Sequence, residues 1–478
     1  MALQPTIGLE VHVELATESK MFCSCRNEFG AAPNSRTCPV CLGLPGALPV
    51  PNRQAVEYVI KTGLALGCHI AERCRFARKN YFYPDLAKNF QISQYDEPLT
   101  HDGFMDLEDD GKPVRIRVRR AHLEEDTGKN IHLPDGRTLV EYNRCGVPLM
   151  EIVTEPDFST AEQVREYLYA LRSILQYLGV STADMEKGQM RCEPTINWID
   201  HETAERTPKV EIKNLNSIKS VYEAVKYELA RQKQAVELCR TEGLCQETRR
   251  WDEDKLVTAS MRLKEGADDY MYFPEPDLAP LAPAPEWIAE IRAGLPELPR
   301  ERARRLQEQY GLPAYDAGVL TDNRPLADYY EAVAAVSPDP KLASNWVMGD
   351  VMASRKQVGG DLTGFPLEPA ALGELLGLIG AGTINNTTAK EVFAKMMAEG
   401  HGAKQIVEAE GLAQISDSGE LERLVEQAIA DNPKIVEDYR GGKEKALGAL
   451  VGAVMKATRG QANAGTVNEL LKQKLLVR

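Results

Sequence analysis

The sequence lacks long apolar segments and the best-known nucleotide-binding motifs. No stretch approaches the ~20 apolar residues that a membrane helix needs, and the first residues lack the basic and apolar regions of a signal peptide. There is no Walker A motif and no glycine-rich dinucleotide motif. The absence of a membrane helix and of a signal peptide predicts a cytoplasmic protein without a membrane partner. The absence of both nucleotide-binding motifs predicts that any nucleotide site is built from a less familiar motif.

The charge of the chain is acidic overall but unevenly distributed. Its 57 Lys and Arg residues face 71 Asp and Glu residues, a formal net charge of −14, which argues against general nucleic-acid binding. Residues 434–478 contain nine basic and four acidic residues, a net +5, so the rest of the chain carries −19. A basic tail on an acidic body indicates a polyanion partner for the tail, and a solvated helical face is the alternative.

Apolar periodicity divides the chain into a mixed half and a helical half. Segments such as 7–15 and 114–119 alternate as strands do, and Ser159 with Glu162 predicts the capping box of a helix that ends at Gly179. The antiparallel hairpin signals are too many for a doubly wound sheet. Prolines crowd into 274–285, which predicts a linker.

Beyond this proline-rich stretch, strand patterns vanish and short helices follow, with a possible joint at Gly400–Gly402. We therefore expect an α+β fold: a mixed and antiparallel β domain with helices, then an all-α domain, then a small helical tail. The expected domain ranges are 1–290, 291–402 and 403–478.

The first predicted strand presents a polar face that is able to bind a cation. Glu10, His12 and Glu14 alternate with apolar residues, so they share one face. Taken alone, this is more simply a strand with one wet face. Further acids follow at Glu124–Asp126 and Glu151, and Glu151 lies inside an apolar run, where a charge is costly to bury unless it is paired or bound to a metal. These acids favour a metal site over a wet strand face, because one His with carboxylates suits Mg²⁺ or Mn²⁺.

Four of the ten cysteines lie in two close pairs separated by twelve residues. Cys23 and Cys25 form the first pair, and Cys38 and Cys41 the second. This spacing is typical of a structural zinc knuckle with four thiolate ligands, which leaves no open position for catalysis. Disulfides or free thiols are the alternative.

Two other segments, 78–88 and 190–193, place cations beside carboxylates. Cations neutralise phosphate oxygens in phosphoryl transfer, and acids hold the metal that bridges them. Taken singly, each segment is more simply a surface loop with salt bridges.

Taken together, these segments resemble one family, the B subunits of the aspartyl/glutamyl-tRNA(Asn/Gln) amidotransferases. Long stretches such as Lys79–Asp85 make coincidence implausible. The matching segments run nearly from end to end of the chain: 7–15, 19–22, 38–52, 78–96, 122–129, 141–157, 211–217, 246–252, 269–278, 343–350 and 442–458.

The resemblance implies a cradle-shaped catalytic domain, a helical domain, and a mobile helical tail like the small YqeY-type domain that contacts tRNA. It implies an ATP-dependent, glutamine-hydrolysing ligase that corrects Glu-tRNA(Gln) or Asp-tRNA(Asn). This subunit would phosphorylate the side-chain carboxylate with ATP, and ammonia from a glutaminase A subunit would displace the phosphate. A small C subunit would join A and B, and the matching synthetase is a further possible partner.

The resemblance also implies roles for particular residues. His12, Glu125 and Glu151 would bind Mg²⁺, with Glu10 as a supporting acid. Lys79 would contact phosphate or carboxylate. Arg191 and Glu193 would line the same pocket, so the expected catalytic residues are Glu10, Lys79, Arg191 and Glu193, with Lys79 and Arg191 binding the nucleotide. The four cysteines match the zinc-bearing branch of the family.

Three residues depart from the family pattern. Glu193 stands where Asp is usual, Gln189 where Ser is usual, and Met271 where Arg is usual. None of them removes an expected metal ligand. A different interpretation of the whole chain is a noncatalytic, zinc-stabilised scaffold that binds tRNA with its knuckle and tail.

Overall fold

The structure, a computed structural model, describes most of the chain. The described residues are 3–200, 202–203, 205–238, 244–263, 270–358, 362–414, 418–443, 445–458 and 461–476. They form two compact units, Met1–Leu298 and Pro299–Arg478, and each is described by itself. Three charged residues of the basic tail, Glu444, Arg459 and Arg478, lie outside the described residues.

The strands lie in the first unit. Their bounds are β1 Leu3–Glu14, β2 His69–Ile70, β3 Ala77–Asn80, β4 Phe90–Ser93, β5 Thr100–Asp109, β6 Lys112–Glu125, β7 Lys129–His132, β8 Thr138–Glu141, β9 Pro148–Thr154, β10 Met190–Asp200, β11 Val210–Lys213, β12 Glu247–Asp252, β13 Val257–Leu263 and β14 Met271–Pro274. The strands predicted at 7–15 and 114–119 correspond to β1 and β6.

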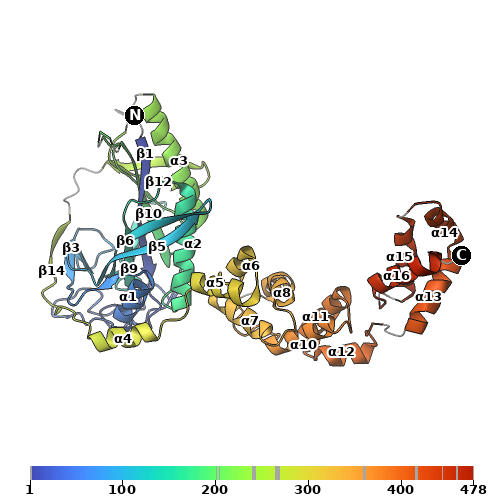
Figure 1. Cartoon of the computed structure of the whole chain (residues 1–478). Helices are drawn as coiled ribbons and strands as arrows, with labels where there is room; N and C mark the ends of the chain where they lie inside the picture. Colours follow the sequence, from blue (N-terminus) through green and yellow to red (C-terminus); the bar gives the residue numbers. More distant parts are fainter. Residues whose placement is uncertain are drawn as a thin grey trace. The chain divides into compact units, whose positions relative to one another are not determined.

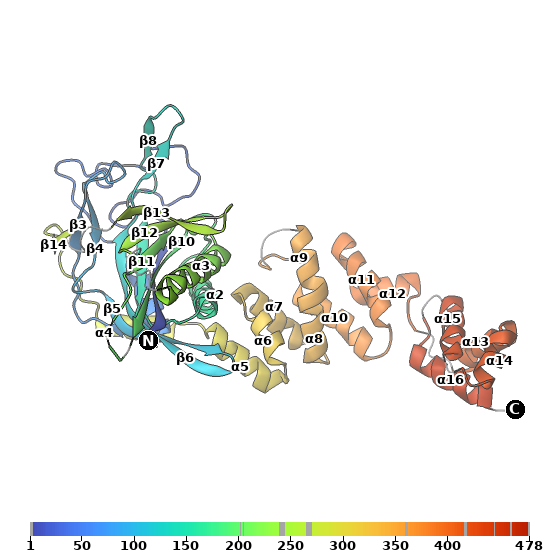
Figure 2. The ribbon, with the colours of Figure 1, turned by 90° about the horizontal axis from the view of Figure 1, so that it is seen from above.

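Among the described residues these strands form three sheets. The largest has nine strands in the order β13-β12-β11-β10-β1-β9-β6-β5-β2, and its pairs are antiparallel except β11 with β12. A second sheet has the order β14-β3-β4. The β7–β8 hairpin, whose turn contains Pro134-Asp135-Gly136, extends from one end of the unit in Figure 2.

One face of the large sheet is covered by α1 Arg53–Ala65, α2 Ala161–Leu178 and α3 Ile218–Glu237; Figure 1 shows α2 and α3 beside it. The side chains of Ile7, Leu9, Val11 and Val13 of β1 are buried in this core, whereas Glu10 is exposed. The strand therefore has the two chemically different faces that the sequence predicts.

The start of α2 corrects one detail of the sequence interpretation. The N-cap is Thr160, whose side chain accepts the backbone N–H of Gln163, so the capping box predicted at Ser159 does not form. The next residue has the same hydroxyl and caps the helix in place of Ser159. At the other end Gly179 closes the helix with φ of 67°, a backbone conformation that favours glycine, as expected.

The proline-rich stretch 274–285 does not separate the two units. It leads into α4 Pro285–Ala293, whose Ile291 is buried in the core of the first unit. Cys74 and Leu281 exchange backbone hydrogen bonds across this stretch. The prolines therefore belong to the first unit and not to a free linker.

The second unit is helical throughout its described residues. Its helices are α5 Pro299–Tyr310, α6 Ala314–Leu320, α7 Arg324–Ala334, α8 Pro340–Trp346, the π-helix Val347–Val351, α9 Met352–Val358, α10 Pro369–Gly380, α11 Asn386–Glu399, α12 Ala403–Glu410, α13 Ser418–Asp431, α14 Pro433–Arg440, α15 Ala446–Ala457 and α16 Ala464–Leu476. One core lies among α5 to α12, and a smaller one among α13 to α16.

These features confirm the α+β fold class followed by helical parts. The expected boundaries at 290 and 402 remain predictions. None of the described helices is both long enough and apolar enough to cross a lipid bilayer.

Candidate active site and cysteine cluster

The polar face of the large sheet brings together the side chains singled out in the sequence. In the strand register, His12 of β1 lies opposite Glu151 of β9 on one side and Arg191 of β10 on the other. Glu10 lies opposite Glu193 of β10. Residues distant in sequence thus meet on adjacent strands, because β1 pairs with both β9 and β10.

A histidine and two glutamates form the centre of this face, which we call the His–Glu cluster: His12, Glu124 and Glu151. Nε2 of His12 lies 3.4 Å from Oε1 of Glu124 and 3.6 Å from Oε2 of Glu151. One ligand atom from each residue lies within 4.8 Å of the other two. The spread fits a single Mg²⁺ or Mn²⁺, whose oxygen ligands lie at about 2.1 Å from the ion.

The electrostatics of the His–Glu cluster also favour a cation. Burial lowers the pKa of His12, but the hydrogen bond to Glu151 and the charges of Glu124 and Glu151 outweigh it and raise that pKa to about 9. Burial, together with the Glu151 charge, raises the pKa of Glu124 to about 7. The carboxylates of Glu124 and Glu151 therefore stabilise a positive charge at the point where they converge.

The position of Glu125 differs from the expectation that it joins His12 and Glu151. Its Oε1 lies 2.6 Å from Nζ of Lys88 and accepts the backbone N–H of Ile92 at 2.9 Å. Neighbouring residues of a strand point to opposite faces, so Glu124 and not Glu125 reaches His12. Side chains of β6 alternate between the two faces of the sheet, and this alternation is the sequence signal that could have identified Glu124.

Further residues that contact the His–Glu cluster were not identified from the sequence, among them His122 and Ser93. His122 is buried, and its Nε2 lies 3.6 Å from Oε2 of Glu151 and 3.3 Å from Oγ of Ser93. The Ser93 hydroxyl donates to Oε2 of Glu124 at 3.3 Å. Burial lowers the pKa of His122 to about 4, so its ring is neutral. Ser93 and His122 thus hold both carboxylates in place.

Lys79 stands beside the same acids. It lies on β3 with its Nζ 4.8 Å from the centre of the Tyr270 ring, a cation–π contact. Burial lowers the pKa of Lys79, but the charges of Glu124 and Glu151 contribute to a net rise above its usual value. The ammonium is therefore charged and close to the His–Glu cluster, as the expected phosphate or carboxylate contact requires.

Arg191 and Glu193 have partners of opposite charge on the same face. Nη2 of Arg191 donates to Oδ2 of the buried Asp126 at 2.5 Å. Oε2 of Glu193 accepts Nζ of Lys213 at 2.5 Å. Carboxylate oxygens of Glu10 and Glu193 lie within 4.8 Å of each other and of Glu211. All the expected catalytic residues therefore lie on or beside this face, in two neighbouring groups.

The other two departures from the family pattern lie on exposed or half-buried surface. The side chain of Gln189 accepts a hydrogen bond from the Thr182 hydroxyl. Met271 lies on β14 with 68% of its side chain exposed. Neither side chain contacts the His–Glu cluster in the described structure.

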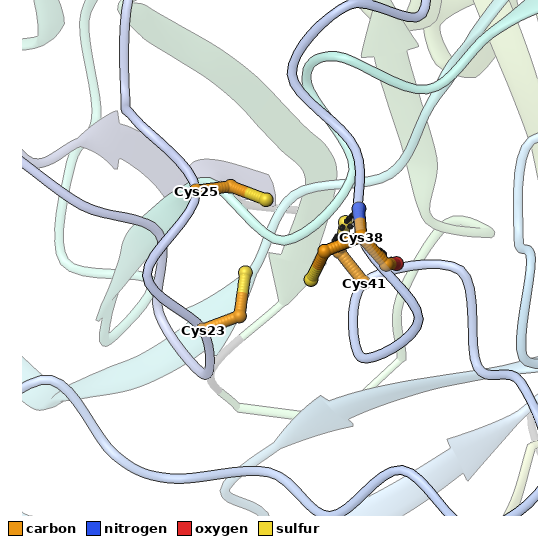
Figure 3. A group of neighbouring side chains, drawn as sticks. All are labelled: Cys23, Cys25, Cys38 and Cys41. Atoms are coloured by element: carbon orange, nitrogen blue, oxygen red, sulfur yellow. Dashed lines mark hydrogen bonds between the residues drawn. The ribbon is translucent and has the colours of Figure 1, made fainter.

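The four predicted cysteines converge from two loops, as Figure 3 shows. Their sulfur atoms all lie within 4.8 Å of one another, and Sγ of Cys41 lies 3.9 Å from Sγ of Cys38. Four thiolates at about 2.3 Å from zinc leave about 3.8 Å between sulfurs, so the thiols fit a tetrahedral ion. The hydrogen bond from Cys23 lowers the pKa of Cys41 to about 5.

A buried lysine supports the cysteine cluster and was not identified from the sequence. Lys20 is 1% exposed, and its Nζ donates to the backbone oxygen of Arg36 at 2.7 Å and to that of Tyr142 at 3.4 Å. Its charge also contributes to the low pKa of Cys41. Lys20 therefore ties the loop between the two cysteine pairs to the segment that follows β8.

Comparison with known proteins places this geometry in a family. Residues 5–289 match the family described as the GatB/GatE catalytic domain, and residues 328–475 match the GatB domain. The first description favours an enzymatic protein over a noncatalytic scaffold.

Full-length relatives agree with both matches. The chain is 52% identical to the B subunit of the aspartyl/glutamyl-tRNA(Asn/Gln) amidotransferase of Carboxydothermus hydrogenoformans, over 99% of this chain and 98% of the relative. It is 51% identical to the protein of the same name from Moorella thermoacetica, over 99% and 100%. The chain belongs to the family of aspartyl/glutamyl-tRNA(Asn/Gln) amidotransferase B subunits.

Proposed function

We propose that this chain activates and amidates the side-chain carboxylate of Glu-tRNA(Gln), Asp-tRNA(Asn) or both, using ATP. The observation that carries the proposal is the His–Glu cluster beside Lys79 on the polar sheet face. Family membership supports it, because the relatives are named for amidotransfer to these tRNAs. A carboxylate is a poor electrophile, so activation must precede attack by ammonia.

The proposed reaction has two displacements. A carboxylate oxygen of the aminoacyl group attacks the γ-phosphorus of ATP, the bond to the bridging oxygen breaks, and ADP leaves. The nitrogen of ammonia then attacks the acyl carbon, phosphate leaves, and the nitrogen loses a proton to give the amide. Negative charge develops in the transition state of each step, and cations held close to it stabilise that charge.

The chain's own residues would divide this work. His12, Glu124 and Glu151 would hold Mg²⁺, with Glu124 in place of the expected Glu125. When bound, the ion supplies positive charge to phosphate oxygens. Lys79 would contact the transferred phosphoryl group or the carboxylate.

The second group on the face would line the pocket. Arg191 would orient the substrate from its position opposite His12, and it would contribute to nucleotide binding together with Lys79. Glu10 would act as a supporting acid. Glu193 reaches one methylene further than the usual Asp and is tied to Lys213, so we propose a supporting role for it.

The cysteine cluster would hold a structural Zn²⁺. Four thiolates complete a tetrahedral shell, so no step of the reaction uses this position. The ion would fix the loops that carry Cys23 to Cys41 against the catalytic unit.

The names of the relatives describe one component of a larger enzyme, and on that basis we propose the remaining partners. An A subunit would release ammonia from glutamine, a C subunit would join A and B, and the matching synthetase could supply the charged tRNA. The basic tail would bind tRNA. We place this work in the cytoplasm, where charged tRNA is made and used.

The test uses the full chain assembled with its partner proteins. A His12→Ala variant should lose ATP-dependent amidation while glutamine hydrolysis continues. Incubation with mischarged tRNA and γ-labelled ATP should yield ADP and a labelled acyl phosphate. Absence of both products with the unsubstituted complex would favour the scaffold interpretation.

A matched pair of variants tests the choice between the two neighbouring glutamates. Glu124→Gln should weaken Mn²⁺ binding, measured by the loss of the free-ion EPR signal, by about 10-fold or more. Glu125→Gln should leave Mn²⁺ affinity nearly unchanged, because Glu125 contacts Lys88. The reverse outcome would restore Glu125 as the ligand.

A further inference from the structure

A bulge in β6 turns one arginine toward the polar sheet face. In the pairing of β6 with β9 the register shifts between Val118 and Arg120, because β6 carries one extra residue there. Val118 and Ala121 are both buried in the core, and Arg119 and Arg120 stand between them. Bulges are common beside active sites, where they redirect a side chain. Arg120 lies two residues before His122, on the same face of the strand.

The guanidinium of Arg120 reaches the edge of the His–Glu cluster. Its Nη2 lies 3.8 Å from Oε1 of Glu151. The other oxygen of Glu151, Oε2, lies 3.6 Å from Nε2 of His12 and 3.6 Å from Nε2 of His122. A distance of 3.8 Å is too long for a hydrogen bond. Arg120 therefore adds positive charge beside Glu151 without donating a hydrogen bond to it.

Arg120 also has a donor without a partner. Its Nε is shielded from solvent and has no hydrogen-bond partner among the residues that the structure describes, while 23% of the side chain is exposed. On β9 it lies opposite Val153, which carries no charge. Arg191, by contrast, donates to Asp126. Since a buried donor is costly to leave unpaired, Arg120 is suited to an anion that enters from the solvent side.

We propose that Arg120 is a further catalytic residue, which binds nonbridging oxygens of the γ-phosphoryl group of ATP during its transfer. The inference deepens the proposed function and rests on it for the identity of the reaction. Arg120 gives up no proton in this step, in which the bond from the carboxylate oxygen to phosphorus forms and the bond from phosphorus to ADP breaks.

The shape of the guanidinium favours the phosphoryl group over the carboxylate of the substrate. A guanidinium binds two oxygens of one anion side by side. If both oxygens of the substrate carboxylate were held in this way, the lone pair that must attack phosphorus would be occupied by a hydrogen bond. Two nonbridging oxygens of the phosphoryl group can be held while phosphorus stays open to attack. An arginine placed there stabilises the charge that these oxygens share in the transition state.

Nucleotide binding tests the contact itself. The assembled complex is titrated calorimetrically, with Mg²⁺ present, with ADP or with an ATP analogue whose β–γ bridge is an imido group. Arg120→Gln should weaken binding of the analogue by about 10–100-fold and leave ADP binding nearly unchanged, because ADP has no γ-phosphoryl group. Arg119→Gln is the matched control, since Arg119 pairs with Glu155 at 2.8 Å and is 53% exposed. Equal weakening of both nucleotides, or of neither, would overturn the proposal.

Metal affinity tests whether Arg120 only holds Glu151 in place. Removing a positive charge beside a cation site does not weaken the attraction of that site for the cation. Arg120→Gln should therefore bind Mn²⁺ at least as tightly as the unsubstituted complex in the EPR titration. A fall in Mn²⁺ affinity of about 10-fold or more would show that Arg120 acts through Glu151, and would refute direct contact with the phosphoryl group.

Single-turnover kinetics test the effect on transfer. With glutamyl-tRNA and saturating γ-labelled ATP, Arg120→Gln should slow the formation of ADP by about 1,000-fold. Arg120→Lys keeps the charge but not the paired donors, so it should recover part of the rate. An unchanged rate in Arg120→Gln would contradict the proposal. Weaker binding of glutamyl-tRNA with unchanged binding of the ATP analogue would assign Arg120 to the carboxylate and also overturn it.

The two levels of inference fail in different ways. If the proposed chemistry is wrong, the unsubstituted complex itself forms neither ADP nor acyl phosphate. If only the role of Arg120 is wrong, the unsubstituted complex and Arg120→Gln form both products at the same rate.

Discussion

The buried ammonium of Lys20 gives the most direct test of how the cysteine cluster is stabilised. Its Nζ donates to the backbone oxygens of Arg36 and Tyr142 at 2.7 and 3.4 Å, inside a region that excludes water. Replacing Lys20 with Met keeps an unbranched side chain, one atom shorter, and removes the charge. Both carbonyl groups then lose a charged donor.

The size of the effect follows from these contacts. Hydrogen bonds to a charged group contribute about 1.5–3 kcal/mol each, and only the first bond is short, so Lys20→Met should lower the free energy of unfolding by about 2–3 kcal/mol. Four thiolates around Zn²⁺ carry a net charge of about −2, which the nearby ammonium offsets. We expect zinc affinity to fall by about 10–100-fold, the range for residues that support metal ligands.

The assay is competition for zinc with a chromophoric chelator, together with urea unfolding of the full chain. Lys61→Met is the matched control, because Lys61 pairs with Glu57 at 2.8 Å on the surface of α1 and such pairs contribute less than about 0.5 kcal/mol. Equal zinc affinity of the Lys20 variant, its control and the unsubstituted chain would refute the argument.

Three further predictions concern other parts of the chain. Ser93→Ala should lower Mn²⁺ affinity about 10-fold by EPR titration, and Ser93→Thr should restore it; no change would exclude the hydroxyl as a support. Burial acts to raise the pKa of Glu331, but hydrogen bonds from two arginines lower it below 4.5, so its stabilisation is present above that pH and is lost as pH falls through the lowered value. Glu331→Gln should therefore cost about 1–2 kcal/mol at pH 7 and less at pH 3 in urea unfolding, and an equal cost at both would contradict this. Substituting Gln for the exposed Lys434, Lys445 and Lys472 should reduce the slope of log affinity for tRNA against log salt by about 1 per lost contact, and an unchanged slope would remove the tail from the interface.

The sequence predicted the site best where local periodicity decides the structure. The alternation in β1 placed His12 and Glu10 on one face, and the spacing of the cysteines predicted their convergence. Both depend on a few neighbouring residues. Cross-strand partners depend on register instead, and register is set by the whole sheet.

The differences between the sequence-based expectations and the structure have the same origin. Glu124 and Glu125 are adjacent in sequence, so only the direction of each side chain on β6 separates them. Lys20 looks like an ordinary surface lysine, since nothing near it in sequence shows that the backbone around Arg36 and Tyr142 will close over it. Ser159 and Thr160 compete for one cap, and the backbone geometry of the turn chooses between them.

The two candidate metal sites lie in one folding unit and differ in which metals they exclude. Four thiolates prefer soft ions and do not bind magnesium, so the ligand type of the cysteine cluster is enough to exclude magnesium. One imidazole and two carboxylates have no such preference, and divalent zinc binds these ligands more tightly than magnesium does. Occupancy of the His–Glu cluster by magnesium would therefore require a low concentration of free zinc in the cell. Micromolar free zinc should displace magnesium from the His–Glu cluster and inhibit the proposed reaction, whereas at the cysteine cluster the same ion would stabilise the fold.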